Sequence, residues 1–452
     1  MSGFRATALA TCWMASLAAQ VPPGERPAAP DPVMVFTEHP RLFLRPQRLR
    51  LLKRERERQS PRWLQLEALV KGGAPLPEPG FAQALYYIVS GDRAVGLQAV
   101  SWALGPAAGL RQMALVFDWC QDALGERQKS DLAARISKGM AALDADESVD
   151  AARDRALAAV ALFDDVPDGP PRELDRLVRV WWEGKIAPAL AQGRPAVSRD
   201  DAYALYELLH AVRDNTNLDL REACPKFFTA LPRSRLMSYY PAAYPSPEND
   251  FRIGAEPQAG PPDLRLAALS RAADLAIVNF DTNAPDSQWL QGWLMHDSFN
   301  MQGAFGSPYE FLWANPYQPG LSFYHLPLAY HDALQGDLFV RSDWEDSAAW
   351  FGYFGGVAQS FENGRLTVVD PRQSPPVRMA PAVVYLGLAG RKFRTTVTEG
   401  QAVFLTGLEP RRAYQVEIDD EEMFEAETDS GGILELDLPH DREVGVRVSV
   451  RP

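Results

Sequence analysis

The chain has 452 residues, 46% of them hydrophobic and 23% charged, which supports a folded core in two or three domains and argues against intrinsic disorder. Its formal net charge of −13 argues against broad binding to nucleic acid or anionic membranes, because phosphate contacts need a basic surface. A local arginine and histidine cluster could still hold one small acidic group.

The N-terminal residues 1–19 predict a secretory signal peptide. Arg5 precedes a short apolar run, and Ser16-Leu17-Ala18 provides a small-x-small cleavage site. An ordinary apolar helix is the alternative. The proline-rich residues 20–37 predict an extended linker, and we expect the mature protein to be secreted or periplasmic. No later segment is long and apolar enough to predict a transmembrane helix.

Helical periodicity follows up to about residue 295. Leu110, Met113 and Phe117, for example, recur at spacings of three and four and form an amphipathic stripe. Short turn signals between the helices favour antiparallel helical hairpins. Residues 240–262 and 296–320 are interpreted as long irregular segments. Helices are expected near 47–58, 61–71, 80–90, 92–104, 107–124, 126–143, 149–164, 171–192, 200–214, 218–230 and 263–278.

Short segments rich in β-branched and aromatic residues take over after about residue 320. Gly, Pro and Asp bound them, which predicts an antiparallel β domain. The acidic run 419–422 is expected to be a solvated hairpin turn, because it lacks the ligand spacing of a calcium loop. Strands are expected within 336–342, 348–354, 365–370, 381–388, 392–397, 402–408, 413–419 and 433–438.

Motifs for nucleotides, serine nucleophiles and zinc are missing from the sequence. None of the six histidines forms a pair with metal-ligand spacing on one helix, so we predict no metal and no cofactor. Cys120 lies in an apolar helical context and is interpreted as a buried free thiol. A single bridge between Cys120 and Cys224 is the alternative.

Three segments carry a family resemblance. The opening His39-Pro40-Arg41-Leu42-Phe43-Leu44 with the basic helix after it, the run from Ala114 through Asp118-Trp119 to Leu124, and the stretch from Gly336 through Arg341-Ser-Asp-Trp344 to Trp350 resemble heparinase II/III-like polysaccharide lyases. The resemblance implies an incomplete α/α toroid over residues 38–318 and an antiparallel β domain over 319–452. It also implies cleavage of a uronate-containing polysaccharide or oligosaccharide by β-elimination.

The family's usual catalytic residues are absent from the matching segments. Residues 148–155 lack the Asn-His pair, residues 355–361 lack the His-x-His-x-Asp segment, and 198–203 replace the E-G-x-x-Y region. Two alternatives therefore stand beside a lyase: a glycan-binding or scaffold protein without chemistry, and a glycoside hydrolase with paired carboxylates. The carboxylates available are Glu207, Asp250, Glu256, Asp297 and Glu310.

Uronate elimination needs a group that neutralises the carboxylate, a base and an acid. One side of helix 200–214 carries suitable side chains, spaced so that they share a face. The tyrosines are expected to stack on sugar rings, and the asparagine to hydrogen-bond sugar hydroxyls. The histidine could act as a base or neutralise the uronate carboxylate, and the arginine could hold that carboxylate. Helix packing is the competing interpretation. These residues are Tyr203, Tyr206, His210, Arg213 and Asn217.

Two further segments hold candidates. Tyr240 or Tyr244, in a proline-rich loop, is a candidate acid or base, although Tyr packed against Pro is the simpler interpretation. Residues 289–313 combine aromatic rings, which stack on sugars, with His and Asn, and could equally form a wedge between domains. The candidates there are Trp289, Trp293, His296 as a base, Asn300 and Trp313.

Overall fold

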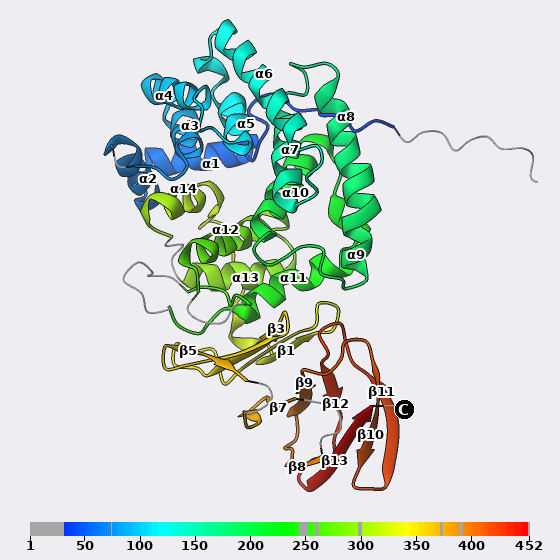
Figure 1. The fold of residues 1–452 in the computed structure, drawn as a ribbon. Helices are drawn as coiled ribbons and strands as arrows, with labels where there is room; N and C mark the ends of the chain where they lie inside the picture. The colour runs from blue at the N-terminus through cyan, green and yellow to red at the C-terminus, as the bar shows by residue number, and fades with distance from the viewer. Residues whose placement is uncertain are drawn as a thin grey trace, which may run out of the picture. The chain divides into compact units, whose positions relative to one another are not determined.

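The computed structural model describes residues 31–73, 75–243, 252–257, 262–296, 301–370, 374–387 and 392–450. Val33–Pro452 form one compact unit. The predicted signal peptide lies outside the described residues. Within Val33–Pro452, helices come first and β-strands follow (Figure 1). The chain therefore combines helices and sheets, as its sequence predicts.

The helical part runs from α1 to α14. Each amphipathic helix buries its apolar stripe; in α5 the predicted stripe residues Leu110, Met113 and Phe117 are all buried. The helices are α1 (Pro46–Glu57), α2 (Pro61–Lys71), α3 (Pro79–Ser90), α4 (Arg93–Ala103), α5 (Leu110–Trp119), α6 (Glu126–Ala142), α7 (Val149–Ala161), α8 (Gly169–Arg176), a π-helical segment η2 (Leu177–Ile186), α9 (Ala187–Ala191), α10 (Ala202–Thr216), α11 (Pro225–Ser238), α12 (Leu264–Phe280), α13 (Pro285–His296) and α14 (Gly303–Trp313).

Alternate helices contact each other in a closed succession. Helix α3 packs against α5, α5 against α7, α7 against α10, α10 against α12, and α12 against α14, which contacts α2 and α3. Helix α1 packs against α2 and α3. Arg48 of α1 donates to the Trp313 carbonyl at the end of α14. This succession brings the C-terminal residues of α10, α12 and α14 to one place, where they meet α1.

The segment that leads into α1 is fixed by one buried carboxylate. Asp118, at the end of α5, accepts hydrogen bonds from the backbone N–H groups of Arg41 (2.9 Å) and Leu42 (2.8 Å) and lies 2.5 Å from His39 Nδ1. Trp119 Nε1 donates to the Leu42 carbonyl at 2.9 Å. Two of the segments that carry the family resemblance therefore meet in one structural contact.

The expectation of an irregular segment over 296–320 is wrong, because α14 lies inside it. Gly303, Gly306 and Pro308 have low helix propensity, which hid the helix in the sequence. Burial of Phe311, Leu312 and other side chains of α14 stabilises the helix by more than its low propensity costs. Helix α11 likewise begins and ends later than the predicted helix at 218–230.

Three sheets follow the helices. The strands are β1 (Ala329–Asp332), β2 (Asp337–Arg341), β3 (Trp350–Phe354), β4 (Val357–Glu362), β5 (Arg365–Val369), β6 (Val377–Met379), β7 (Ala382–Leu386), β8 (Lys392–Thr396), β9 (Ala402–Thr406), β10 (Ala413–Ile418), β11 (Glu422–Glu427), β12 (Leu434–Leu436) and β13 (Glu443–Val450). Their orders are β1-β2-β3-β4-β5, β12-β9-β7-β6 and β11-β10-β13-β8.

These sheets stack on one another. The middle sheet is buried on both faces: Val383 and Tyr385 pack toward the β10–β13 sheet, while Val384 and Leu386 pack toward the β1–β5 sheet. The first sheet turns its other face, including Trp350, to the helical core. Strand β7 is accordingly apolar at every position, as expected for a strand covered on both sides.

The expectation of a wholly antiparallel β domain is also wrong at one pair. Strands β7 and β9 pair in parallel, with Val384 opposite Phe404. The chain leaves the middle sheet after β7, forms β8 in the neighbouring sheet, and returns as β9 in the same direction. All other strand pairs among the described residues are antiparallel.

Three smaller expectations can be compared with the structure. Asp419 and Asp420 form the turn between β10 and β11 with positive φ angles of 53° and 60°, the conformation of a tight hairpin. Cys120 and Cys224 are both free and buried, and burial raises the pKa of Cys224 to about 11. No helix in the described ranges is long and apolar enough to cross a membrane.

Candidate functional site

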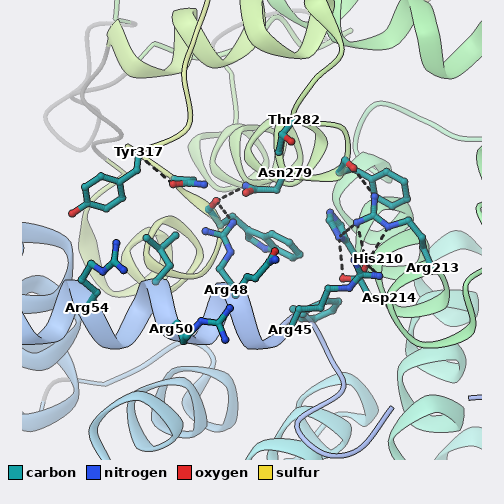
Figure 2. Close-up of a pocket in the computed structure, with 16 residues that line it drawn as sticks. Arg45, Arg48, Arg50, Arg54, His210, Arg213, Asp214, Asn279, Thr282 and Tyr317 are labelled. Atoms are coloured by element: carbon teal, nitrogen blue, oxygen red, sulfur yellow. Dashed lines mark hydrogen bonds and ion pairs between the residues drawn. The ribbon is translucent and has the colours of Figure 1, made fainter. Parts of the chain in front are cut away.

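A pocket of about 640 Å³ lies between α1 and the C-terminal ends of α10, α12 and α14 (Figure 2). We call it the arginine pocket. Helix α1 begins with Pro46 and carries three of its arginines, while Leu52 and Glu55 on the same helix are buried. Helix α10 supplies the acidic member and the fifth arginine. The charged residues that define the pocket are Arg45, Arg48, Arg50, Arg54, Arg213 and Asp214.

The charge of the arginine pocket is opposite to that of the chain. Five arginines and one carboxylate give it a formal charge of +4 (5 − 1), against −13 for the whole protein. Low-dielectric walls around such a cluster focus its field on the space between them. A small or extended anion is therefore the ligand chemistry that the lining favours.

Two of the five arginines share the pocket's carboxylate. Arg45 Nη2 and Arg213 Nε each lie 3.0 Å from Asp214 Oδ1. Arg213 also donates to the Phe280 carbonyl at 2.5 Å and lies 3.5 Å above the Phe280 ring. Burial alone would raise the pKa of Asp214, but His210, Arg213 and Arg45 outweigh burial and hold it below the ordinary value.

Arg48 is held by backbone carbonyls at the end of α14. Its Nη2 donates to the Trp313 carbonyl at 2.6 Å and its Nη1 to the Ala314 carbonyl at 3.3 Å. A cation at a helix C-terminus is favourable because it meets unpaired carbonyls and the negative end of the dipole. Burial nevertheless lowers the pKa of Arg48 to about 10.

Arg50 and Arg54 differ from these three. Both are exposed, and within the described part of the chain neither guanidinium has an ion-pair or hydrogen-bond partner. Tyr317 lies near Arg54 at the same end of the pocket (Figure 2). The Tyr317 ring is 50% exposed, and its hydroxyl accepts from Arg58 Nη1 at 3.2 Å.

His210 lies in the wall of the pocket, between two aromatic rings. Its ring centroid is 4.8 Å from those of Phe280 and Trp313. Nε2 lies 3.0 Å from the Ala276 carbonyl, which can only accept, so Nε2 carries the proton and Nδ1 faces Arg213 and Asp214. Burial lowers the pKa of His210, against the opposing effect of Asp214. The imidazole is thus covered at both ring nitrogens.

Trp313 connects the pocket to a buried ionic network. Its Nε1 donates to Tyr203 Oη at 2.9 Å, and Tyr203 donates to Glu207 Oε1 at 2.7 Å. Glu207 is fully buried and bonded to both Arg111, through two hydrogen bonds, and Arg153. Burial would raise the pKa of Glu207, but the arginines outweigh it, so the carboxylate stays ionised.

The structure distributes the predicted residues of α10 over different surroundings. His210 and Arg213 line the arginine pocket, whereas Tyr203 joins the buried network. Tyr206 packs edge-on against Phe228 and Phe280 and lines a different, smaller pocket. Asn217 is exposed and ends the helix in the left-handed conformation, with φ of 62°. The five side chains expected on one face therefore do not share one pocket.

Tyr240 lies where the helical part meets the first sheet. Its hydroxyl donates to Gln359 Oε1 at 3.0 Å, and its ring stacks on Phe361 at 4.9 Å. Gln359 belongs to the segment in which the lyase family carries histidines. Tyr240 is 1% exposed, and Tyr244 lies outside the described residues.

The aromatic candidates between residues 289 and 300 pack against other side chains of the protein. Trp293 is buried against Tyr239, Phe323 and Trp344, and Trp289 is half-buried beneath Arg233. His296, with 37% of its side chain exposed, lies 3.8 Å from Asp346 Oδ1. Asn300 lies outside the described residues.

The carboxylates considered for hydrolysis are not gathered in one pocket. Glu207 and Glu310 are buried and ion-paired, to Arg111 and Arg271 respectively. Burial raises the pKa of Glu256 to about 7, but this residue lies near the first sheet. Asp250 and Asp297 lie outside the described residues. In the described ranges, no group of three His, Cys, Asp or Glu side chains is placed to hold a metal ion.

Sequence reasoning missed Arg50, Arg54 and Tyr317. The signal for the first two was present, because the segment PQRLRLLKRERE is strongly basic and places Arg50 and Arg54 one helical turn apart. Such spacing is typical of a solvated helix face, so it did not point to a site. Tyr317 lies beyond α14, in a stretch where no element was predicted.

Comparisons with known proteins give a structural likeness but no sequence match. No protein-family model matches the chain, and no curated protein matches its sequence. A solved structure named as a glycoside hydrolase aligns with 83% of this chain and 71% of its own, at a TM-score of 0.35 and 11% identity.

Proposed function

We propose that this protein is carbohydrate-directed and binds an acidic, uronate-containing oligosaccharide in the arginine pocket. The observation that carries the proposal is the concentration of five arginines, with only one carboxylate, in the lining of a single pocket of a chain of net charge −13. Arginine binds carboxylates through a planar, two-pronged contact that lysine cannot make. Asn279, Thr282 and Tyr317 add groups suited to sugar hydroxyls and sugar faces.

The family resemblance and the helix packing support the same proposal. The closed succession of contacts through α3, α5, α7, α10, α12 and α14 supports an incomplete α/α toroid. The segments around Asp118 and Arg341 resemble polysaccharide lyases of that architecture. Export to the periplasm or the exterior is part of the proposal, and N-terminal sequencing of protein recovered from the producing cells would test it.

Binding is tested by isothermal titration calorimetry with a uronate tetrasaccharide and its neutral counterpart. We expect the acidic ligand alone to bind, with affinity that falls as salt rises. Arg54→Gln should weaken binding, whereas Lys53→Gln, an exposed neighbour outside the pocket lining, should not. Equal affinity for the neutral tetrasaccharide would overturn the proposal.

β-Elimination is the reaction that we propose for this pocket, and the exposed phenol of Tyr317 is the observation that favours it. Arg54 would neutralise the uronate carboxylate, and the Tyr317 phenolate would take the proton from the adjacent carbon. A carbon–carbon double bond forms as the bond to the glycosidic oxygen breaks, and that oxygen takes the proton back from the Tyr317 hydroxyl, which regenerates the phenolate. His210 is less suited to this role, because Arg213 and Asp214 cover its free nitrogen.

The ultraviolet absorbance of the unsaturated product separates a lyase from the alternatives. Wild-type protein should generate this absorbance. Tyr317→Phe should bind the tetrasaccharide normally, but its rate of product formation should fall at least about a hundredfold. Binding without absorbance would establish the non-catalytic alternative, and new reducing ends without absorbance would establish a hydrolase. Undiminished turnover by Tyr317→Phe would remove this residue from the mechanism.

A further inference from the structure

The arginine pocket has two ends that differ in how their charges are paired. Arg45 and Arg54 lie at opposite ends of α1, about 13 Å apart at 1.5 Å per residue. Figure 2 shows Arg45, His210, Arg213 and Asp214 together at one end and Arg54 with Tyr317 at the other. A ligand that spans the pocket therefore meets two chemically distinct surroundings.

At the first end, which we call the Asp214 end, the cationic groups are already engaged. Arg45 and Arg213 both contact Asp214, and Arg213 is further held by the Phe280 carbonyl and ring. A carboxylate placed there would have to compete with Asp214 for both guanidinium groups and would approach a like charge. Sugar hydroxyls meet no such penalty, because Asp214 and the exposed Thr282 hydroxyl can hydrogen-bond them.

At the second end, which we call the Arg54 end, the cationic groups are unpaired. Among the described residues neither Arg50 nor Arg54 has an acidic or carbonyl partner. No carboxylate belongs to the pocket lining other than Asp214 at the far end. An anion bound here gains the unpaired guanidinium of Arg54, with that of Arg50 one helical turn away toward the middle of the pocket, without displacing an existing ion pair.

We propose that the arginine pocket selects a mixed oligosaccharide, with one uronate held at the Arg54 end and an uncharged, hydroxyl-bearing sugar at the Asp214 end. A polymer in which every sugar carries a carboxylate is the poorer ligand. This inference rests on the proposed function and specifies its substrate class. Arg48, between the two ends, stays bonded to the backbone carbonyls at the end of α14.

Three tetrasaccharides of equal length test the inference by calorimetry: one with a single terminal uronate next to neutral sugars, one with a uronate at every position, and one wholly neutral. We expect the single-uronate ligand to bind tightest. The double variant Arg50→Gln/Arg54→Gln should lose roughly tenfold in affinity for it, about 1.4 kcal/mol. Lys53→Gln should leave all three affinities unchanged.

Asp214→Asn provides the converse test. Removal of the like charge should raise affinity for the all-uronate ligand relative to the single-uronate ligand. If this variant fails to fold, the comparison of the three ligands on wild-type protein still decides the question. Tighter binding of the all-uronate ligand by the wild type would overturn this inference and leave the proposed function intact. No binding of either acidic ligand would overturn both.

Discussion

Asp118 is the residue on which the position of α1 depends. Its buried carboxylate accepts from the N–H groups of Arg41 and Leu42 and contacts His39. Asp118→Ala would leave these donors buried without partners, at about 1–3 kcal/mol for each. We therefore expect the free energy of unfolding, measured with urea, to fall by roughly 3 kcal/mol or more.

Asp118→Asn and Asp122→Ala are the matched controls for this prediction. The amide of Asp118→Asn keeps one acceptor oxygen and the shape of the side chain. Asp118→Asn should therefore lower the free energy of unfolding less than Asp118→Ala does. Asp122 is an exposed acidic neighbour, and its substitution should change stability by no more than about 0.5 kcal/mol. Equal losses in Asp118→Ala and Asp122→Ala would contradict the assigned role.

Individual residues also mark what the sequence can and cannot predict about the candidate site. Arg213 and His210 were found because helical spacing places them together, and Trp313 because aromatic residues suit sugars. Whether an arginine is free for a ligand depends on partners distant in sequence, such as the Phe280 carbonyl beside Arg213. Helical periodicity carries no such information, so Arg54 was not distinguished from a solvated arginine.

At the scale of elements, His331 joins strand β1 to the C-terminal sheets. Nε2 lies 2.8 Å from Asp429, and Nδ1 lies 3.2 Å from Glu435 of β12. Burial lowers the pKa of His331, but hydrogen bonds to the two carboxylates outweigh burial and raise it above the ordinary value. The buried Asp337, whose own pKa is raised to about 7, is a further acidic group near this histidine.

The raised pKa predicts how stability changes with pH. A histidine whose pKa is higher in the folded state stabilises that state fully below its unfolded value of about 6.5, and the contribution is lost as pH rises through the folded value. Urea unfolding at a series of pH values should therefore show the wild type losing its advantage over His331→Gln as pH rises. His440→Gln, which changes an exposed histidine, should keep the wild-type profile. An advantage that grows with pH would contradict the assignment.

Two glycines in helical segments should respond to alanine in opposite ways. A Cβ on Gly292 of α13 would lie 2.1 Å from the Leu321 carbonyl oxygen, so Gly292→Ala must shift the segment that crosses the helix. We expect Gly292→Ala to lower the free energy of unfolding by about 1–3 kcal/mol. Gly184 of η2 is exposed, and a Cβ there would meet only the Arg179 carbonyl at 3.5 Å. Gly184→Ala should therefore raise the free energy of unfolding by up to about 1 kcal/mol. Thermal unfolding of both variants measures the difference; a shift of the same sign in both would be contrary to this packing.

Elements were predictable where local pattern and tertiary packing agree. Helix α5 and strand β7 follow from their apolar spacing. Helix α14 does not, because Gly306 and Pro308 disfavour a helix and only its buried contacts stabilise it. The parallel pairing of β7 with β9 depends on β8 joining another sheet, a choice that strand patterns do not encode.

Across the whole molecule, the segments that carry the family resemblance have structural roles. Asp118 fixes the chain before α1. Arg341 is buried, with its guanidinium 4.2 Å from the Trp344 ring and 5.3 Å from the Trp293 ring, and Trp350 Nε1 donates to the Met237 carbonyl at 2.9 Å. In this chain these segments therefore determine packing, and their presence does not by itself specify chemistry.

The shared packing predicts that the helical part and the first sheet unfold together. Trp350 of β3 is fully buried in the same core as Met237 of α11 and Phe361 of β4. Trp350→Ala should lower the free energy of unfolding by about 3–5 kcal/mol. Hydrogen exchange should then show the same loss of protection in peptides from α11 and from β3. Met423→Ala, at an exposed position on β11, should change neither the free energy of unfolding nor the protection of these peptides. If β3 lost protection while α11 kept it, the two parts would be separate folding units, and the arginine pocket would depend on the helices alone.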